Sequence, residues 1–250
     1  RIIARLDIKG PNLIKGVNFE GLRVIGKPRD FAKKYYLEGI DELIYIDTVA
    51  TLYGRNNLLE FVKEIGKEVF IPMTVAGGIR SVNDAKTFLY AGADKVGINT
   101  AAVKNPEILK EIASRFGNQC LVLVIDAKKI SNNKWEVLTE NGREKTGIDV
   151  VDWAKKANTL GIGEILLTSI DQDGTKKGLD INLVNEIKKV IDVPLIVSGG
   201  VGKMEHIQDL FSKTQNYNIA IGTSLHKEIL KIGKIKKFFL DRKFKVRIDD

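Results

Sequence analysis

Ile71-Pro-Met-Thr-Val-Ala-Gly-Gly-Ile79 has a close counterpart later in the chain, Val193-Pro-Leu-Ile-Val-Ser-Gly-Gly-Val201. Each segment is a short apolar run, typical of a buried strand, that ends in a pair of glycines. The prolines of the two segments stand 122 positions apart, and the same offset joins Glu42-Leu-Ile to Glu164-Ile-Leu. Repetition at this distance in a chain of 250 residues indicates two equivalent halves.

Strand and helix patterns alternate along both halves. Eight short apolar runs predict strands at 2–7, 42–47, 71–75, 95–98, 121–125, 164–168, 195–197 and 219–221. Amphipathic segments between them predict helices at 30–38, 58–67, 82–90, 106–116, 150–160, 183–190, 204–211 and 228–240. A (β/α)8 barrel consists of eight units of one strand followed by one helix, which is the number predicted here. We therefore predict an α/β fold, one TIM-barrel domain over 1–250 with half-barrels at about 1–118 and 119–250; an open doubly wound sheet is the alternative.

The composition restricts the class of protein. The hydrophobic share of 44% fits a soluble globular chain, and no apolar run approaches the roughly 18 to 20 residues that span a bilayer. The charged first strand does not have the apolar core of a secretory signal. The single cysteine, Cys120, falls in a predicted strand and is interpreted as a buried thiol in a reducing compartment. We expect a cytoplasmic protein with no membrane partner.

The charge balance is basic, with 40 Lys and Arg against 32 Asp and Glu, a net charge of +8. The basic residues are spread over helix faces without a nucleic-acid motif, which favours a solvated lysine-rich surface, with a phosphorylated substrate as the second interpretation and no nucleic-acid partner. The two histidines, His206 and His226, have no Cys or acidic cluster at ligand spacing. We therefore predict no metal and no cofactor.

The glycine pairs predict two phosphate sites. Each pair follows a strand and precedes a helix, where backbone N–H groups and the helix dipole favour an anion. A small polar segment follows in each half, Gly97-Ile-Asn-Thr100 and Ile221-Gly-Thr-Ser224. By the half-barrel repeat, the two sites lie on opposite sides of the barrel mouth; tight turns without a ligand are the alternative. The candidate phosphate residues are Gly77, Gly78, Asn99, Thr100, Gly199, Gly200, Gly222 and Thr223.

Two aspartates at strand ends are the candidates for chemistry. Asp7 and Asp126 end the first and fifth strands, 119 positions apart, and so face each other across the predicted mouth. Such a pair suits acid–base catalysis if one carboxyl is protonated and the other is ionised. Capping of the following loops is the alternative. Asp47 and Asp173 are further polar residues at strand ends.

Charged residues also begin four strands, at the opposite end of the barrel. Arg1, Glu42, Lys95 and Glu164 are expected to form a salt-bridged ring across the floor. Strand alternation places Arg5 in the lumen between this ring and Asp7. A buried cation needs a partner, so we expect a carboxylate or an ordered anion in contact with Arg5, and a lowered pKa for Asp7.

Several segments together resemble one known family. They are Lys15-Gly-Val-Asn-Phe19, Gly92-Ala-Asp-Lys-Val96, Asn99-Thr-Ala-Ala-Val103, Glu164-Ile-Leu-Leu-Thr-Ser-Ile-Asp171, Asp173-Gly-Thr175, Ser198-Gly-Gly200 and Gly202-Lys-Met-Glu-His206. Over nearly its whole length, the chain is similar to the cyclase subunits of imidazole glycerol phosphate synthase, the HisF family.

This resemblance implies an ammonia-dependent cyclase of histidine biosynthesis. Ammonia from a glutaminase (HisH-like) subunit at the N-terminal face passes up the barrel. At the mouth, ammonia and a bis-phosphorylated ribulosyl formimino carboxamide ribotide give imidazole glycerol phosphate and an aminoimidazole carboxamide ribotide. The resemblance assigns Asp7 and Asp126 as the acid–base pair, Lys15 to the substrate, and the ring on the floor as the ammonia gate; a static seal is the alternative for the ring.

The chain also departs from the family pattern near the substrate entrance. Arg5 replaces a small uncharged residue, Gly10-Pro-Asn12 replaces Asp-Gly-Arg, Val24 replaces an acidic residue, and Ala76 replaces a third glycine. These departures resemble a diverged branch that helps to amidate a nucleotide-linked sugar for surface polysaccharide. That function is the first alternative, and a non-catalytic ammonia conduit or docking subunit is the second.

Overall fold

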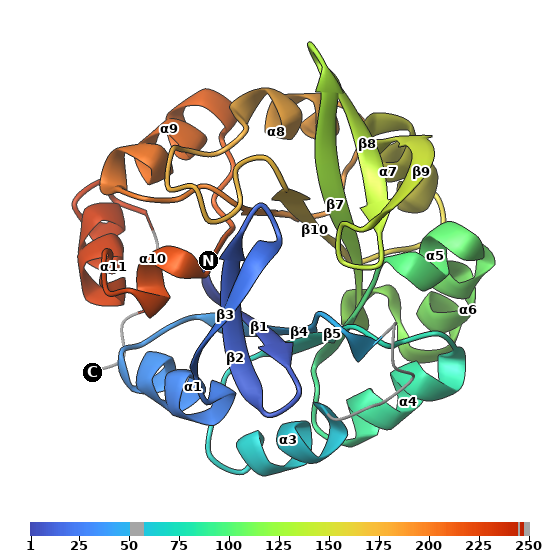
Figure 1. The fold of residues 1–250 in the computed structure, drawn as a ribbon, viewed down its shortest axis with the longest axis horizontal. Coiled ribbons are helices and arrows are strands. Elements are labelled where there is room, and N and C mark those ends of the chain that lie inside the picture. The colour runs from blue at the N-terminus through green and yellow to red at the C-terminus, as the bar shows by residue number, and fades with distance from the viewer. Residues whose placement is uncertain (51–57, 245, 248–250) are drawn as a thin grey trace.

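The computed structural model describes residues 1–50, 58–244 and 246–247. Within these residues, eight parallel strands close into a barrel in the order β10-β11-β12-β1-β4-β5-β6-β7, and the pairing of β10 with β7 completes the circle (Figure 1). They are β1 (Ile2–Lys9), β4 (Glu42–Asp47), β5 (Met73–Ala76), β6 (Lys95–Ile98), β7 (Leu121–Ser131), β10 (Glu164–Ser169), β11 (Leu195–Ser198) and β12 (Ile219–Ile221). The barrel prediction is confirmed, and closure excludes the open sheet.

Helices surround the barrel on its outside (Figure 1). In the described residues they are α1 (Pro28–Leu37), α3 (Leu58–Ile65), α4 (Val82–Tyr90), α5 (Thr100–Lys104), α6 (Glu107–Phe116), α7 (Val150–Asn158), α8 (Ile181–Lys188), α9 (Met204–Thr214), α10 (Thr223–His226) and α11 (Ile232–Leu240). The main core lies between these helices and the outward side chains of the strands. Ser81 caps α4 by accepting a hydrogen bond from the backbone N–H of Asp84.

A second, smaller core fills the lumen. Its aliphatic side chains come from alternate positions of the strands, because successive residues of a strand point to opposite faces. These residues are Ile3, Ile44, Ile46, Ala76, Val122, Val124, Leu166, Ile196 and Ala220. The same alternation points Arg1, Arg5 and Asp7 of β1 inward, and so fixes the order of charges along the barrel axis.

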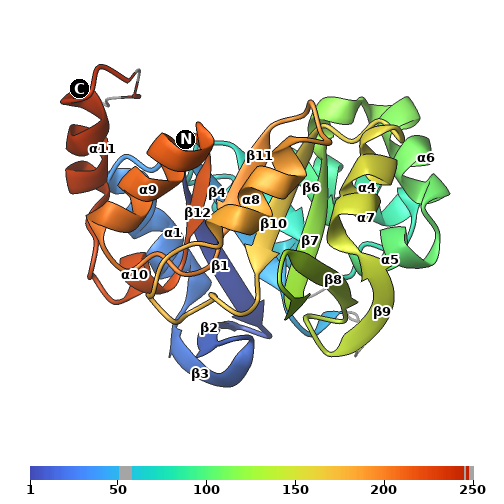
Figure 2. The ribbon, with the colours of Figure 1, turned by 90° about the horizontal axis from the view of Figure 1, so that it is seen from above.

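The segments after the first and fifth barrel strands differ from the prediction. The expected long loop after β1 is a hairpin of β2 (Asn12–Val17) and β3 (Glu20–Gly26), and β7 continues into β8 (Lys134–Thr139) and β9 (Glu144–Asp149). Figure 2 shows both hairpins at one end of the barrel, with the N-terminus at the other. The turns that join β2 to β3 and β7 to β8 contain non-glycine residues of positive φ, Asn18, Phe19 and Asn133, so glycine does not mark these two turns. The β8–β9 turn does contain a glycine of positive φ, Gly142.

Some boundaries also differ. Cys120 is not in a strand: it ends a short 3-10 helix, η1 (Asn118–Cys120), before β7, and it is buried. Helix α11 begins four residues later than predicted, and α5 and α10, each no longer than five residues, were not predicted. These two short helices begin at Thr100 and Thr223, so they place both hydroxyl groups at the barrel mouth.

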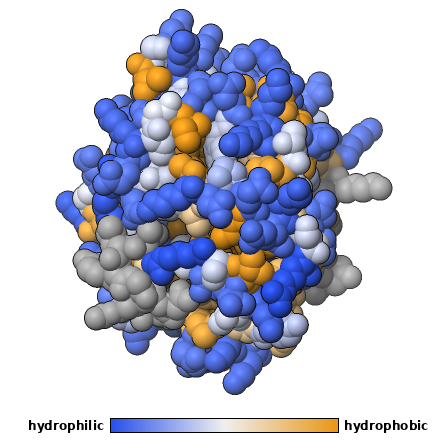
Figure 3. All heavy atoms as spheres, turned by 90° about the vertical axis from the view of Figure 1, so that its right-hand side faces the viewer, coloured by the Kyte–Doolittle hydropathy of each residue, from blue (hydrophilic) through white to orange (hydrophobic). Residues whose placement is uncertain are grey.

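One side of the outer surface is polar. The side drawn in Figure 3 is mostly hydrophilic, with apolar atoms scattered among charged ones. No helix among the described residues is long and apolar enough to cross a membrane.

Candidate active site

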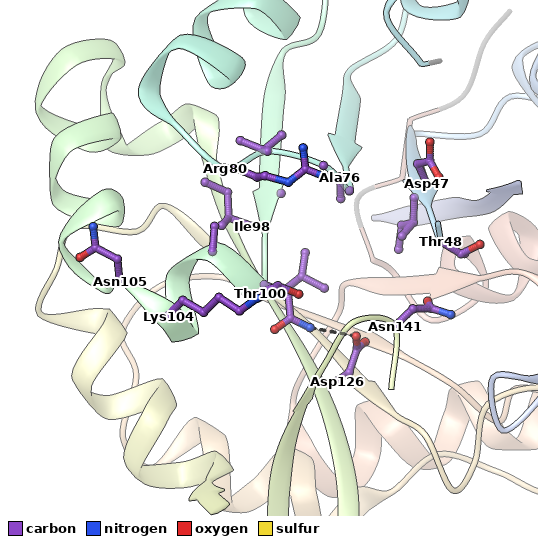
Figure 4. A pocket seen from close by; sticks show the side chains of 18 residues that line it. Asp47, Thr48, Ala76, Arg80, Ile98, Thr100, Lys104, Asn105, Asp126 and Asn141 are labelled. Atoms are coloured by element: carbon purple, nitrogen blue, oxygen red, sulfur yellow. Dashed lines mark hydrogen bonds between the residues drawn. The ribbon is translucent and has the colours of Figure 1, made fainter. Parts of the chain in front are cut away.

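A pocket of about 260 Å3 opens at the C-terminal ends of β4, β5, β6 and β7 (Figure 4). Six predicted site residues line it: Asp47, Gly77, Gly78, Asn99, Thr100 and Asp126. The bottom of this pocket is apolar, because the inward side chains Ile46, Ala76 and Val124 also line it. The structure therefore brings the phosphate candidates of the first half and one catalytic aspartate into one cavity.

The glycine turn of this pocket requires glycine. Gly77 has a φ of +97°, and a Cβ on it would lie 2.4 Å from the backbone oxygen of Asp47. A side chain here would strain the backbone and displace the end of β4. Gly77 thus lets β4 and β5 approach closely enough to form one wall.

Asp126 has a buried carboxyl group with a neutral partner. Its Oδ2 accepts a hydrogen bond of 3.0 Å from the side-chain amide of Asn99 (Figure 4). Burial raises the pKa of Asp126 to about 6, against the opposing effects of Arg5 and of this hydrogen bond. A carboxyl group that titrates near neutrality can both accept and donate a proton at physiological pH.

Asp7 lies in a cationic environment. Its Oδ1 accepts from Arg5 Nε at 2.8 Å, and its Oδ2 accepts from Lys15 Nζ at 2.7 Å. Lys15 Nζ also donates to Asp173, at 3.0 and 3.3 Å to its two oxygens. Burial favours a higher pKa for Asp7, but Arg5 and then Lys15 outweigh it and hold the pKa well below its usual value. Both expectations for Arg5, a carboxylate contact and a lowered Asp7 pKa, are confirmed.

The β2–β3 hairpin covers this ion-pair network. The backbone N–H of Asn18 donates to the backbone oxygen of Asp173 at 2.8 Å, and the ring of Phe19 lies 5.4 Å from Arg5 Cζ, in cation–π contact. The hairpin that was predicted as a loop therefore separates Arg5 from solvent, and only 2% of the Arg5 surface is exposed.

The glycine pair of the second half is also closely packed. Gly199 and Gly200 both have positive φ, and a Cβ on Gly200 would lie 1.9 Å from the backbone oxygen of Gly178. Gly222 lies against Lys15, whose Cε would be 3.5 Å from a Cβ there. The buried hydroxyl of Thr223 has no hydrogen-bond partner among the described residues, as expected of a group that binds a ligand.

The four charged residues at the barrel floor form a closed ring. Arg1 pairs with Glu42 at 2.6 Å and with Glu164, and Lys95 pairs with Glu42 at 3.2 Å and Glu164 at 2.8 Å. The two acids alternate with the two bases, so each charge has two opposite neighbours. The predicted salt-bridged ring is present, at the end of the barrel opposite the mouth.

Several residues of the pocket were not predicted from the sequence. Arg80, Lys104 and Asn141 also line it, and Figure 4 shows Arg80 and Lys104 extending from the side away from Asp47 and Thr48. Basic residues shortly after Gly-Gly and Asn-Thr were a usable signal for an anion site. The Asn141-Gly142 pair was a usable turn signal, but the position of Asn141 at the pocket was not predictable, because it depends on how the β8–β9 turn packs over the mouth.

Comparison with known proteins identifies the family of this chain. A family model described as "Histidine biosynthesis protein" matches residues 1–231. An imidazole glycerol phosphate synthase subunit HisF of Legionella pneumophila is 63% identical over 205 residues, which cover 82% of this chain and 97% of the relative. The chain belongs to the HisF family.

More distant HisF subunits match nearly the whole chain. The Streptococcus mutans subunit is 44% identical over 247 residues, 99% of this chain and 98% of the relative. A Bacillus cereus subunit is 46% identical over 249 residues, again 99% of this chain and 98% of the relative. The resemblance found in the sequence motifs is thus confirmed along the whole barrel.

The raised pKa of Asp126 makes a prediction about stability. A carboxyl group whose pKa is higher in the folded state stabilises the fold at low pH, and this stabilisation is lost as pH rises through the folded pKa. We expect Asp126→Asn to increase the free energy of unfolding by about 1 to 3 kcal/mol at pH 8, with little increase at pH 4. Urea unfolding at both pH values measures this, and an equal effect at the two pH values would contradict it.

Proposed function

We propose that this HisF-family subunit, a lyase-type cyclase of histidine biosynthesis, carries out its reaction at the mouth pocket with Asp126 and Asp7 as the catalytic carboxylates. The substrates are ammonia and the bis-phosphorylated ribulosyl formimino carboxamide ribotide, and the products are imidazole glycerol phosphate and an aminoimidazole carboxamide ribotide. The observation that carries the proposal is the buried Asp126 carboxyl at the edge of a cavity lined by Gly77, Gly78 and Thr100.

The chemistry needs a group that moves protons. When ammonia forms a bond to a substrate carbon, its nitrogen becomes positively charged and must lose a proton before the ring closes. Asp126 suits this step, because its pKa of about 6 leaves it ionised and able to accept at neutral pH. The protonated carboxyl can then return the proton to the nitrogen of the departing ribotide.

The two phosphates are assigned to the two glycine turns. In the first half, Gly77, Gly78 and Thr100 lie in the pocket together with Arg80 and Lys104, which add positive charge. In the second half, the residues are Gly199, Gly200, Gly222 and Thr223, and the unpartnered Thr223 hydroxyl supports the assignment. Lys15, Asp47, Asn99 and Asp173 surround the space between the two turns and are proposed to contact the rest of the substrate.

We also propose a glutaminase partner at the N-terminal face of the barrel, with the ring on the floor as the ammonia gate. HisF relatives are named as synthase subunits, which supports a partner chain. Exposed apolar residues occur where helices end and strands begin, which is the floor side of a barrel: Leu37, Phe70, Tyr90 and Tyr217. These residues and the ring together suit a docking face. The buried free thiol of Cys120 is consistent with a reducing cytoplasm.

Replacing Asp126 tests its role. We expect Asp126→Asn to lower ammonium-driven turnover by about 100- to 10,000-fold, because general acid–base groups contribute on this scale. In the unmodified chain, kcat/KM for ammonia, calculated with the concentration of unprotonated NH3, should decrease when the pH is lowered below about 6, because Asp126 becomes protonated. The control is Asp192→Asn, at an exposed aspartate. Full activity of Asp126→Asn would eliminate the acid–base role.

Replacing a ring residue tests the gate. Lys95→Met leaves Glu42 and Glu164 with Arg1 as their remaining partner in the ring, so the floor should no longer control passage. In the complex with the glutaminase, we expect more glutamate formed per molecule of product, while ammonium-driven turnover of the isolated chain is unchanged. Lys67→Met, at an exposed lysine, is the control. An unchanged ratio of glutamate to product would favour the static seal.

A further inference from the structure

The two mouth aspartates have equivalent positions but different neighbours. Asp7 and Asp126 lie 119 positions apart, and at the same offset Arg5 corresponds to Val124. Val124 is buried in the aliphatic layer of the lumen, whereas Arg5 donates directly to Asp7. The difference between the two carboxyl groups therefore begins at one position in each half-barrel, where one half has a cation and the other a hydrocarbon.

We propose that Arg5 is a positioning residue that keeps Asp7 permanently ionised and leaves Asp126 as the one carboxyl of this pair that exchanges a proton during turnover. The proposal rests on the proposed function and assigns its two aspartates separate tasks. Asp126 accepts and returns the proton, and Asp7 holds the ammonium group of Lys15 at the mouth.

The contacts of Asp7 leave no simple way to protonate it. Arg5 occupies one oxygen and Lys15 occupies the other, at 2.8 and 2.7 Å. A proton on either oxygen would break a charge-assisted hydrogen bond and leave a buried cation with less compensation, which is costly. Asp7 is 5% exposed and Lys15 7%, so water does not replace the lost contact readily.

Arg5 is itself held in place. Its Nη1 donates to Thr168 at 2.8 Å and to Ser198 at 3.3 Å, across the lumen on β10 and β11. These hydroxyl contacts aim Nε at Asp7, and the Phe19 ring covers the guanidinium from the mouth side. The guanidinium of Arg5 is thus held at Nε and at Nη1. It acts as a constant positive charge, because a guanidinium does not lose its proton in proteins.

The other charged groups around Asp7 leave this result unchanged. Those that face it from other elements are Lys15 on β2, Asp126 on β7, Asp173 after β10 and His226 on α10. Asp173 shares Lys15 and so keeps the lysine protonated: burial favours a lower pKa for Lys15, but Asp173 and Asp7 outweigh it and raise the pKa. Burial lowers the pKa of His226 to about 4, so this ring is neutral at pH 7.

Asp126 shows the opposite arrangement. Within the described residues, Asp126 accepts its hydrogen bond from a neutral amide, that of Asn99, and Arg5 influences it through space without a hydrogen bond to it. Protonation of Asp126 therefore breaks no ion pair. The burial of the carboxyl, which raises its pKa to about 6, then favours proton exchange near neutral pH.

The direct test is a pH titration of the resting protein. Aspartate carboxyl carbons are labelled with 13C and followed by NMR from the lowest pH at which the chain remains folded up to about pH 8, and Asp7→Asn and Asp126→Asn assign the two signals. We expect Asp126 to titrate in this range and Asp7 to remain ionised. In Arg5→Met, the pKa of Asp7 should rise by about 1 to 3, and Arg5→Lys should restore most of the original behaviour.

A second arginine variant is the control for removing an arginine that does not contact Asp7. Arg29→Met removes an exposed arginine that also pairs with a carboxylate, Glu68, and should leave the Asp7 signal unchanged. If Asp7 titrates above about pH 4.5 in the unmodified chain, or if Arg5→Met leaves its pKa unchanged, the proposal is wrong. If Arg5→Met does not fold, the unmodified chain and Arg5→Lys still decide it.

Kinetics separate this proposal from the proposed function. With ammonium salt and the bis-phosphorylated substrate, the acidic limb of the pH profile should show a single ionisation in the unmodified chain and two in Arg5→Met. An unaltered profile in Arg5→Met would overturn the division of tasks. Absence of turnover in the unmodified chain would overturn the cyclase function, while the titration of resting protein still decides whether Arg5 controls the charge of Asp7.

Discussion

The ion pairs of Asp7 with Arg5 and Lys15 are the constraint on which the mouth of this barrel depends. A buried guanidinium is tolerated only when its charge and its N–H groups are matched, and here Asp7, Thr168 and Ser198 provide the match. These three residues come from β1, β10 and β11. The network therefore joins the start of the chain to its second half, and it holds Lys15 Nζ between Asp7 and Asp173.

The lumen has a fixed sequence of layers because β-strands alternate their side chains. On β1 alone, Arg1 belongs to the ring on the floor, Ile3 to the aliphatic layer, and Arg5 and Asp7 to the mouth. The ring on the floor and the ion pairs at the mouth are both charged, and the layer of aliphatic side chains lies between these two charged groups. This arrangement suits a neutral molecule such as ammonia, which crosses an apolar layer more easily than an ion does.

Local patterns in the sequence predicted much of this structure. The apolar runs and the repeated Gly-Gly segments identified the eight strands, and the alternation of β1 correctly placed Arg5 in the lumen beside a carboxylate. The β2–β3 and β7–β8 hairpins were missed because their turns use Asn18, Phe19 and Asn133 in a conformation typical of glycine. The β8–β9 turn did offer a usable signal, Asn141-Gly142. Their importance for the site is long-range: Phe19 covers Arg5, and Asn141 lines the pocket.

The different environments of the two aspartates needed the structure. Asp7 and Asp126 look equivalent in the half-barrel repeat; the alternation of β1 indicated a lowered pKa for Asp7 beside Arg5, but no local pattern indicated a raised pKa for Asp126. Only the folded chain shows that Lys15 returns from β2 to Asp7, whereas Asn99 on the neighbouring strand end supplies Asp126 with a neutral amide. Burial without a hydrogen-bonded cation raises the pKa of Asp126, whereas Arg5 and Lys15 lower the pKa of Asp7.

The most direct test of cyclase function is the steady-state rate of the purified chain with ammonium salt and the bis-phosphorylated ribulosyl formimino carboxamide ribotide. The geometry predicts saturable turnover that forms imidazole glycerol phosphate and the aminoimidazole carboxamide ribotide in equal amounts. A chain that is folded, as shown by a cooperative unfolding transition, and that forms neither product would contradict the cyclase function.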